Sequence, residues 1–383
     1  MGQEHVVAAG PSGSNVTEAS EGVAAWLRSS PLYRVKLRLQ FTGWLQFMLP
    51  FMGATVLLLT AGLLALLGAS DWAFAAAALA VGSALLGAFD LVTVKAGIRP
   101  RESHPTRLDT LDAFSVMRAR RSTRSFQSTD LTEEDRATLL GAAEQWTRPE
   151  ALLGSSDIRL EYVRGSLTVW PVVGAHEFLV ALAPRAYDRT SIIDVGRSLQ
   201  HVVTEATRRG ISTCWIGPGA DQSTVAAALG DRFDLDRDHV VCVCAVGYRS
   251  RFLPTLVRFM NHHMHRRLPL TDLFFVDADL TEPAPTTAQP YSRFGRTYEA
   301  CEWAPSSYNA QPTRARLTAD ASRVTRVDFI ASTPSRFYAP VALGIWLANW
   351  ETGCTALGIE GASKILDDPP PGRGYYGASW VAA

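Results

Sequence analysis

The hydrophobic pattern begins with two long apolar runs near the N-terminus. The run over 41–69 contains no charged residue, and a second, Ala-rich run covers 72–89. A helix needs about 20 apolar residues to cross a bilayer, and both runs approach or exceed that length. The turn between them is short. The pattern therefore predicts an antiparallel transmembrane hairpin over residues 41–94, with helices at about 43–67 and 72–92.

Basic residues flank this hairpin on both sides, whereas the loop between the two runs carries only Asp71. The flanking residues are Arg28, Arg34, Lys36, Arg38, Lys95, Arg99, Arg101 and Arg107. By the positive-inside rule, both termini and the rest of the chain face the cytoplasm, with the lipid bilayer as a partner. Residues 1–40 are expected to be a disordered, basic segment, because 1–22 is rich in Gly, Ser and Ala. A buried hairpin in a soluble protein is the alternative.

Beyond residue 108 the pattern alternates between amphipathic helices and short strands, which is typical of an α+β protein with three layers. Thr132 is expected to cap a helix, and Gly210 to end a long one. The predicted helices cover 108–120, 133–146, 191–210, 221–230, 296–304 and 339–353, and the predicted strands cover 158–165, 176–183, 212–217, 239–248 and 325–332. We divide this part into a first half (108–270), a Pro-rich connector (271–292) and a second half (293–383).

Two helix-containing segments of these halves resemble each other. Residues 198–219 align with the segment that begins at 339 when Gly210 is placed on Gly353, an offset of 143 (353 − 210). Each segment has a long apolar-faced helix, a terminating Gly, a short strand and a Gly-containing loop. Identity is low, so chance similarity is the alternative. A true repeat would make the chain a pseudo-dimer with an internal two-fold relation, and a monomeric state would then be reasonable.

Composition narrows the possible functions. Lys+Arg and Asp+Glu both number 37, a balance that argues against a bulk nucleic-acid binder. The five cysteines include no CxxC pair, which disfavours a disulfide framework or a zinc site and suits a reducing compartment. The His262-His263-Met264-His265 run lies in an Arg-rich stretch without a spaced acidic or Cys ligand, so we interpret it as a solvated basic segment and predict no metal.

Two motifs carry the candidate chemistry. Residues 120–126 read RRSTRSF, and residues 304–312 read APSSYNAQP. Arginine offers fork-shaped donors to a phosphate, and a serine hydroxyl adds a neutral partner. Prolines fix the second segment as a loop. Each motif has a plainer reading, as a basic turn and as an ordinary Pro/Ser/Asn loop.

Together these motifs resemble the nitroreductase superfamily, over about Val116 to Asp367. The resemblance implies a nitroreductase fold, with FMN as the cofactor and NAD(P)H as co-substrate. It implies that the first motif holds the FMN phosphate and ribityl chain, and that the second lines the flavin ring from the other subunit. The residues concerned are Arg120, Arg121, Ser122 and Arg124 in the first motif and Pro305, Ser306, Ser307, Asn309 and Gln311 in the second.

Two further segments extend the resemblance. The loop at Ile216-Gly217-Pro218 falls where the family places backbone against the flavin, and a Gly there permits close approach. Glu360-Gly361 is its counterpart in the repeat, so the choice between the two loops stays open, although Ile216 and Gly217 share a half with RRSTR. After the predicted strand 239–248, Arg249 and Arg251 are candidates for phosphate contact.

The order of motifs departs from the common family pattern. The second motif is degenerate in the first half, as Trp146-Thr147-Arg148-Pro149, and the second half lacks an RRSxR segment. This resembles a subgroup with two half-units fused in one chain. One intact motif of each kind predicts one FMN per chain, bound between the halves.

The implied activity is hydride transfer from NAD(P)H through flavin to a nitro compound, a quinone or another small organic acceptor at the membrane. The chemistry takes place on the cofactor, so no catalytic side chain is assigned. Two alternatives remain: a non-catalytic protein that binds or stores FMN, and a degenerate membrane scaffold without flavin.

Overall fold

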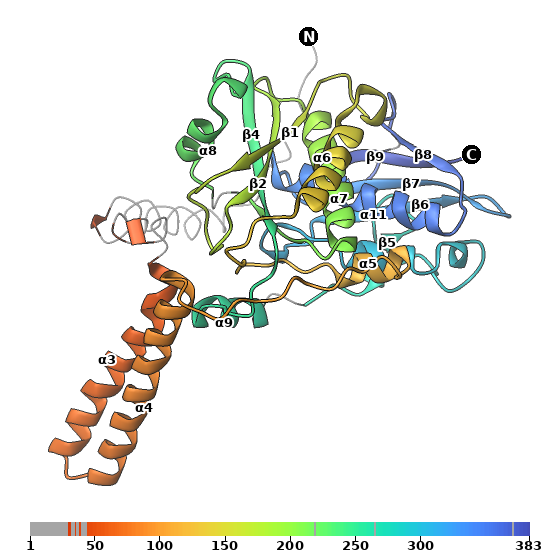
Figure 1. Ribbon diagram of the computed structural model, residues 1–383. Helices are drawn as coiled ribbons and strands as arrows, with labels where there is room; N and C mark the ends of the chain where they lie inside the picture. Colours follow the sequence, from red (N-terminus) through yellow and green to blue (C-terminus); the bar gives the residue numbers. More distant parts are fainter. Residues whose placement is uncertain are drawn as a thin grey trace.

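The computed structural model of the protein describes residues 30, 31, 35, 38, 39, 44–217, 220–263, 266–369 and 371–383. Most of the predicted N-terminal segment, together with Pro218, Met264 and His265, lies outside these residues. Figure 1 shows a helical hairpin that projects from a mixed helix and sheet domain. The helices of the domain are α5 (Ala113–Ala119), α6 (Glu133–Thr147), α7 (Arg189–Arg208), α8 (Gln222–Leu229), α9 (Thr255–His263), α10 (Thr297–Glu302) and α11 (Tyr338–Ala356).

The hairpin consists of α3 (Leu45–Leu66) and α4 (Ser70–Asp90), which pack along each other. Both helices are long and apolar enough to cross a membrane, α4 together with the single π turn that follows it. Pro50 frees backbone groups inside α3, and the Ser83 hydroxyl of α4 donates to the Pro50 carbonyl at 2.7 Å. Gly68, at φ +76°, forms the turn between the helices.

The base of the hairpin is docked on the domain (Figure 1). The Asp90 carboxylate, at the end of α4, is buried and accepts the Thr255 amide at the start of α9 at 2.8 Å. Arg99, just beyond the hairpin, donates to the Ser250 hydroxyl and to the Phe126 carbonyl at 3.0 and 2.9 Å. Near the start of α3, Phe47 is fully buried. The hairpin and the domain therefore share a packed junction.

The domain contains two sheets of matching design. The first is ordered β1-β2-β4-β3, and the second is ordered β5-β6-β7-β9-β8. All neighbouring strands are antiparallel except β5 and β6, which are parallel. The strands are β1 (Arg159–Arg164), β2 (Glu177–Pro184), β3 (Ser212–Ile216), β4 (Asp238–Gly247), β5 (Phe274–Phe275), β6 (Thr313–Ala319), β7 (Val324–Ala331), β8 (Gly361–Lys364) and β9 (Tyr375–Ala382). In each half, two strands precede a long helix and two follow it, and the second sheet has the short β5 as an additional strand at its edge.

The register proposed for the repeat was wrong. Gly353 lies inside α11, which continues to Ala356, and the glycine with positive φ after this helix is Gly358. Gly210, after α7, has φ +74°, as expected for a helix-ending glycine, and Gly358 has φ +64°. The offset between the halves is therefore 148 (358 − 210). Helices α7 and α11 follow different apolar patterns and end on different residues, so the sequence alone did not reveal the offset of 148.

The two long helices cross at glycines that obey the same offset (344 − 196 = 148). A Cβ on Gly344 would lie 2.0 Å from the Ile193 carbonyl oxygen, and one on Gly196 would lie 2.2 Å from the Val341 carbonyl oxygen. Only glycine allows backbones to approach this closely. Helices α7 and α11 thus form the centre of the domain, between the two sheets (Figure 1).

Candidate functional site

Two adjoining cavities lie where the first half meets the loop after α10. Four residues line both of them, namely Ser122, Arg124, Pro305 and Ser306. The first two come from the RRSTRSF segment and the last two from the APSSYNAQP loop. The fold therefore brings the two sequence motifs, which are far apart in the chain, to a single place.

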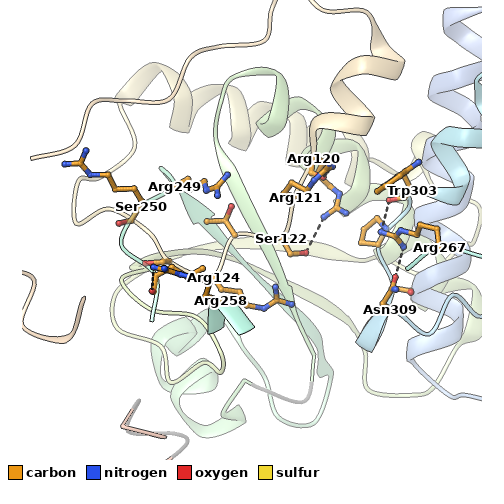
Figure 2. A pocket seen from close by; sticks show the side chains of 16 residues that line it. Arg120, Arg121, Ser122, Arg124, Arg249, Ser250, Arg258, Arg267, Trp303 and Asn309 are labelled. Carbon is orange, nitrogen blue, oxygen red and sulfur yellow. Dashed lines mark hydrogen bonds between the residues drawn. The ribbon is translucent and has the colours of Figure 1, made fainter. Parts of the chain in front are cut away.

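The first cavity, of about 550 Å³, is rich in arginine (Figure 2). Its lining residues come from both halves of the domain, and none of the described ones is acidic. They are Arg120, Arg121, Ser122, Thr123, Arg124, Ser125, Arg249, Ser250, Arg251, Leu253, Arg258, Arg267, Trp303, Pro305, Ser306 and Asn309. Seven guanidinium groups around one cavity create a strongly positive potential, which suits an anionic ligand such as a phosphate group.

The positive charges around this cavity repel one another. Burial, followed by repulsion from Arg267 and Arg121, lowers the pKa of Arg120 to about 10. The pKa of Arg267 is also lowered, mainly by burial. Arg121 and Arg267 both lie over the Trp303 ring, each 5.5 Å from its centroid. An anion bound among these groups would relieve the repulsion, so the arrangement favours a ligand of opposite charge.

Backbone pairing positions the RRSTRSF segment. Thr123 donates its amide to the Thr213 carbonyl of β3 at 2.9 Å, and Phe126 forms a bridge with Arg249 just after β4. The segment therefore runs in extended form past the ends of both strands. This placement brings Arg249 and Arg251, the two candidates for phosphate contact after β4, beside the first motif.

The APSSYNAQP loop has three non-glycine residues with left-handed backbone: Tyr308, Asn309 and Gln311, at φ +51°, +55° and +47°. Such conformations are costly for most residues and need support from their surroundings. The Ser306 hydroxyl accepts the Gln311 amide at 2.9 Å. The Asn309 side chain accepts from Arg267 at 2.7 Å, and the Gln311 side chain accepts the Leu268 amide at 2.9 Å.

These contacts alter two sequence-based interpretations. Asn309, expected at the ring, lines the Arg-rich cavity, and Gln311 is found in the lining of neither of the two adjoining cavities. Arg267, which follows the His-rich run and was not among the predicted site residues, is partly buried and donates to the Asn309 side chain (Figure 2). The side chains of His262 and His263 lie outside the described part of the structure.

The second cavity, of about 510 Å³, is mainly apolar and aromatic. Its lining residues are Leu45, Ser122, Arg124, Trp170, Pro171, Trp215, Ile216, Gly217, Val241, Cys242, Pro305, Ser306, Ser307, Tyr308, Phe337, Tyr338, Val341, Ala342 and Ile345. The loop at Ile216 and Gly217 therefore faces this cavity, whereas Glu360 lines a separate one with Arg293 and Arg323. A Cβ on Gly217 would lie 3.3 Å from the Tyr338 ring, so a larger residue would crowd the cavity wall.

Two buried donors in the site lack a partner within the described chain. They are the Trp215 indole Nε1, in the apolar cavity, and the Arg267 Nε, in the Arg-rich cavity. Buried polar groups are normally hydrogen-bonded, so both donors indicate a ligand with acceptor atoms. A molecule with an anionic end and a flat, largely apolar ring system with acceptors at its edge matches both cavities. FMN has this chemistry, and the residues present fit it.

Sequence reasoning missed several lining residues, among them Arg258, Trp170 and Tyr338. Each comes from a segment without a motif, so no local signal was available. Trp215 and Trp303 could have been found, because each directly precedes a segment that the motif analysis had already selected.

At the equivalent site, which the two halves also build together, the corresponding positions are filled by interacting side chains. With the offset of 148, Arg197 corresponds to Ile345 and Ser363 to Trp215. Arg197 pairs with Glu351 at 2.9 Å, and the Ser363 hydroxyl donates to the same carboxylate. Trp146, from the degenerate motif, stacks on His201 with ring centroids 3.5 Å apart. Polar and aromatic packing thus occupies the counterpart of the apolar cavity.

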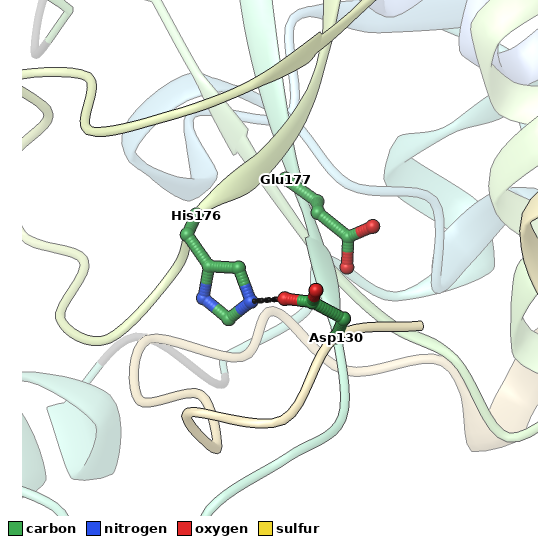
Figure 3. A group of neighbouring side chains, drawn as sticks. All are labelled: Asp130, His176 and Glu177. Carbon is green, nitrogen blue, oxygen red and sulfur yellow. Dashed lines mark hydrogen bonds and ion pairs between the residues drawn. The ribbon is translucent and has the colours of Figure 1, made fainter. Parts of the chain in front are cut away.

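Another polar cluster lies outside both cavities (Figure 3). It contains Asp130, His176 and Glu177, with the His176 Nε2 2.6 Å from an Asp130 oxygen. Glu177 accepts the Leu131 amide at 2.8 Å and pairs with Arg136 at 3.1 Å. Asp130 also pairs with Arg164. These carboxylates already have protein donors, and the contacts tie the start of α6 to β2.

Comparisons with known proteins place the chain in context. The sequence matches the family described as "Putative TM nitroreductase" over residues 112–354, more than half of the chain. No curated protein matches it significantly. A "putative nitroreductase" from Thermotoga maritima is 15% identical, covering 74% of this chain and 97% of that one, with a TM-score of 0.42.

Two other solved structures match smaller parts of the chain. A nitroreductase with bound FMN from Bacteroides fragilis is 16% identical over 37% of this chain and 89% of that one, with a TM-score of 0.31. The FMN-dependent nitroreductase NfnB from Mycobacterium smegmatis, in complex with NADPH, is 16% identical over 36% of this chain and 88% of that one, with a TM-score of 0.30.

Proposed function

The chain belongs to the nitroreductase family, as its motifs predicted, and on that premise we propose that it is an FMN-dependent oxidoreductase. It takes hydride from NAD(P)H and reduces a small organic acceptor, such as a nitro compound or a quinone, at a membrane. One FMN binds per chain, between the two halves.

The observation that carries this proposal is the junction of an Arg-rich cavity with an apolar, aromatic one. The phosphate would lie among Arg120, Arg121 and Arg124, with Arg249 and Arg251 beside them. The flavin ring would lie in the apolar cavity, which two loops line. One loop contributes Ile216 and Gly217, and the other contributes Pro305, Ser306 and Ser307.

The protein's share of the chemistry is binding and exclusion of water. When bound, FMN supplies hydride transfer between NAD(P)H and the acceptor. The Arg-rich cavity fixes one end of the cofactor by charge, and the Trp215 indole offers a hydrogen bond in the apolar cavity. Aromatic walls from Trp170 and Tyr338 keep this cavity apolar, which favours flat organic molecules.

The hairpin gives the enzyme its location. Its two apolar helices are long enough to cross a bilayer, and basic residues flank both of its ends. With the positive-inside rule, the termini and the flavin domain would face the cytoplasm, where NAD(P)H is available.

The first test is the absorbance spectrum of detergent-purified protein. Bound flavin absorbs at about 450 nm, and we expect one FMN per chain. NAD(P)H oxidation with menadione or a nitrofuran as acceptor then measures turnover. The double variant Arg124→Ala/Asn309→Ala should lose the flavin, whereas Arg148→Ala, in the degenerate motif, should keep it.

Each outcome has a distinct meaning. A colourless protein that takes up no added FMN would contradict the proposal. Bound FMN with no NAD(P)H oxidation would favour an FMN-binding or storage protein instead. Flavin retained by the double variant would refute the assignment of the site to these two motifs.

A further inference from the structure

We propose that the acceptor is a membrane-resident, amphipathic quinone, whose ring enters the apolar cavity from the lipid side, past Leu45. This inference rests on the proposed function and specifies its substrate class. The acceptor has a flat ring that accepts two electrons and an apolar tail that stays in the bilayer.

The first observation is that the membrane hairpin forms part of the cavity wall. Leu45, the first residue of α3, lines the apolar cavity together with Trp170 and Tyr338. The remaining lining residues come from the flavin domain. A hairpin that served only as an anchor would have no need to contribute a side chain to the site.

The second observation concerns depth in the bilayer. Trp44 directly precedes α3 and is 45% exposed, and the Lys95 ammonium, beyond the end of α4, lies 5.2 Å from its ring centroid. Tryptophan and lysine are favoured at the membrane–water boundary. Leu45 follows Trp44 and therefore lies at the edge of the hydrocarbon region. The Leu45 side of the cavity is thus level with the lipid boundary.

The third observation is that this geometry is held by specific contacts. Asp90 accepts the Thr255 amide, Arg99 donates to the Ser250 hydroxyl, and α3 packs against α9. Ser250 also lines the Arg-rich cavity. These contacts hold the hairpin against the part of the domain that lines the cavities, as expected for an access route.

The volume of the apolar cavity limits which part of the acceptor can enter it. Its volume of about 510 Å³ must hold the cofactor ring and the acceptor ring together. Little space is left for a long tail, so the tail would extend past Leu45 along α3, among lipid chains. The polar, Arg-rich end is unsuited to an apolar tail.

The reaction balances without another reagent. NAD(P)H gives up two electrons and one proton as hydride, and a second proton comes from water. The quinone gains both electrons and both protons and becomes the hydroquinone, while NAD(P)H becomes NAD(P)⁺. The two carbonyl oxygens of the quinone end as hydroxyls.

The test uses the full-length, FMN-loaded protein in lipid nanodiscs. Menadione, which has no tail, is compared with a menaquinone that carries the same ring and an isoprenoid tail. The measured quantity is the ratio of kcat/KM for the tailed quinone to kcat/KM for menadione. Leu45→Gln should lower this ratio about tenfold, because an unpaired amide at the lipid-facing wall disfavours the tail. Leu66→Gln, at the opposite end of α3 and absent from the cavity lining, should leave it unchanged.

A second readout does not depend on turnover. A tailed quinone with a diazirine on its first isoprene unit should label the start of α3, and mass spectrometry of peptides would locate the label. Labelling confined to the cytoplasmic loops, or equal ratios in the two variants, would overturn this inference while menadione reduction left the proposed function intact. Failure to reduce any acceptor would overturn the proposed function and this inference with it.

Discussion

The two halves of the domain share a strand order and a central helix, and together they form two equivalent sites that are filled differently. At the first site, Trp215 and Ile345 line an apolar cavity beside seven arginines. At the second site, the equivalent Ser363 and Arg197 meet at the Glu351 carboxylate. The same backbone plan thus leaves open cavities at one site and a packed interior at the other.

The difference lies in how charge is compensated. Glu351 receives donors from Arg197, His201 and Ser363, so its charge is neutralised inside the chain. The cations around Arg120 face one another, and the described lining offers them no carboxylate. A cluster of like charges without a carboxylate in its lining favours a ligand of opposite charge, whereas a carboxylate paired within the chain favours a structural role.

The largest expected effect comes from reversing the charge at the centre of the Arg-rich cavity. Arg120→Glu should weaken FMN binding about 1,000-fold, or ~4 kcal/mol, because a cation is lost and an anion faces the phosphate. Flavin fluorescence titration measures the affinity. The matched control is Arg148→Glu, an exposed residue of the degenerate motif, which should bind FMN normally. Equal loss in both variants would remove the distinction between the two sites.

The helix crossing that both halves share should be nearly as sensitive. Gly344→Ala would place a Cβ 2.0 Å from the Ile193 carbonyl oxygen, so we expect a loss of about 3 kcal/mol in the free energy of unfolding. Gly141→Ala in α6 is the control, since no atom lies within 4 Å of its Cβ position. That variant should be slightly stabilised. Chemical denaturation followed by circular dichroism measures both. A harmless Gly344→Ala would contradict the close crossing.

The filled site should depend on its Glu351 carboxylate for stability. Glu351→Gln should lower the free energy of unfolding by about 2 kcal/mol, because it removes the charge and leaves Arg197 and His201 poorly compensated. FMN affinity should change little, since Glu351 lines neither of the two adjoining cavities. A large loss of flavin with unchanged stability would reverse the roles that we assign to the two sites.

Acidification should reproduce the loss of stability expected for Glu351→Gln. Burial raises the pKa of Glu351, but the hydrogen bond from His201 and the charge of Arg197 outweigh it and lower the pKa to about 2, from an ordinary 4.5. Its contribution is therefore complete above pH 4.5 and is lost as the pH falls toward 2. Burial also lowers the pKa of His201, which adds destabilisation below its ordinary value of 6.5. Thermal melts across this range should show wild type and Glu351→Gln converging at low pH.

The smallest expected effect concerns the unpartnered indole. Trp215→Phe keeps an aromatic wall but removes the Nε1 donor, so FMN affinity should fall about fivefold, or ~1 kcal/mol. Trp146→Phe, in the filled site, is the control and should leave affinity unchanged. Unchanged affinity in Trp215→Phe would mean that this donor does not contact the cofactor.

Much of the molecule could be predicted from local patterns. The hairpin follows from two uncharged apolar runs, and its helices begin and end within a few residues of the expected positions. Thr132 caps α6 by accepting the Asp135 amide, as predicted. The RRSTR and APSSYNAQP segments were recognised as partners in one site, and the structure places both at one pair of adjoining cavities.

What the sequence determined by itself was the local part: the apolar helices, the helix ends and the two motifs, because each depends on residues that are neighbours in the chain. Only the tertiary structure decided the repeat offset of 148, the contact of Arg267 with Asn309 and the place of Leu45 in the cavity wall. These features join segments far apart in the chain, and side-chain packing, which no local pattern encodes, determines which of them meet.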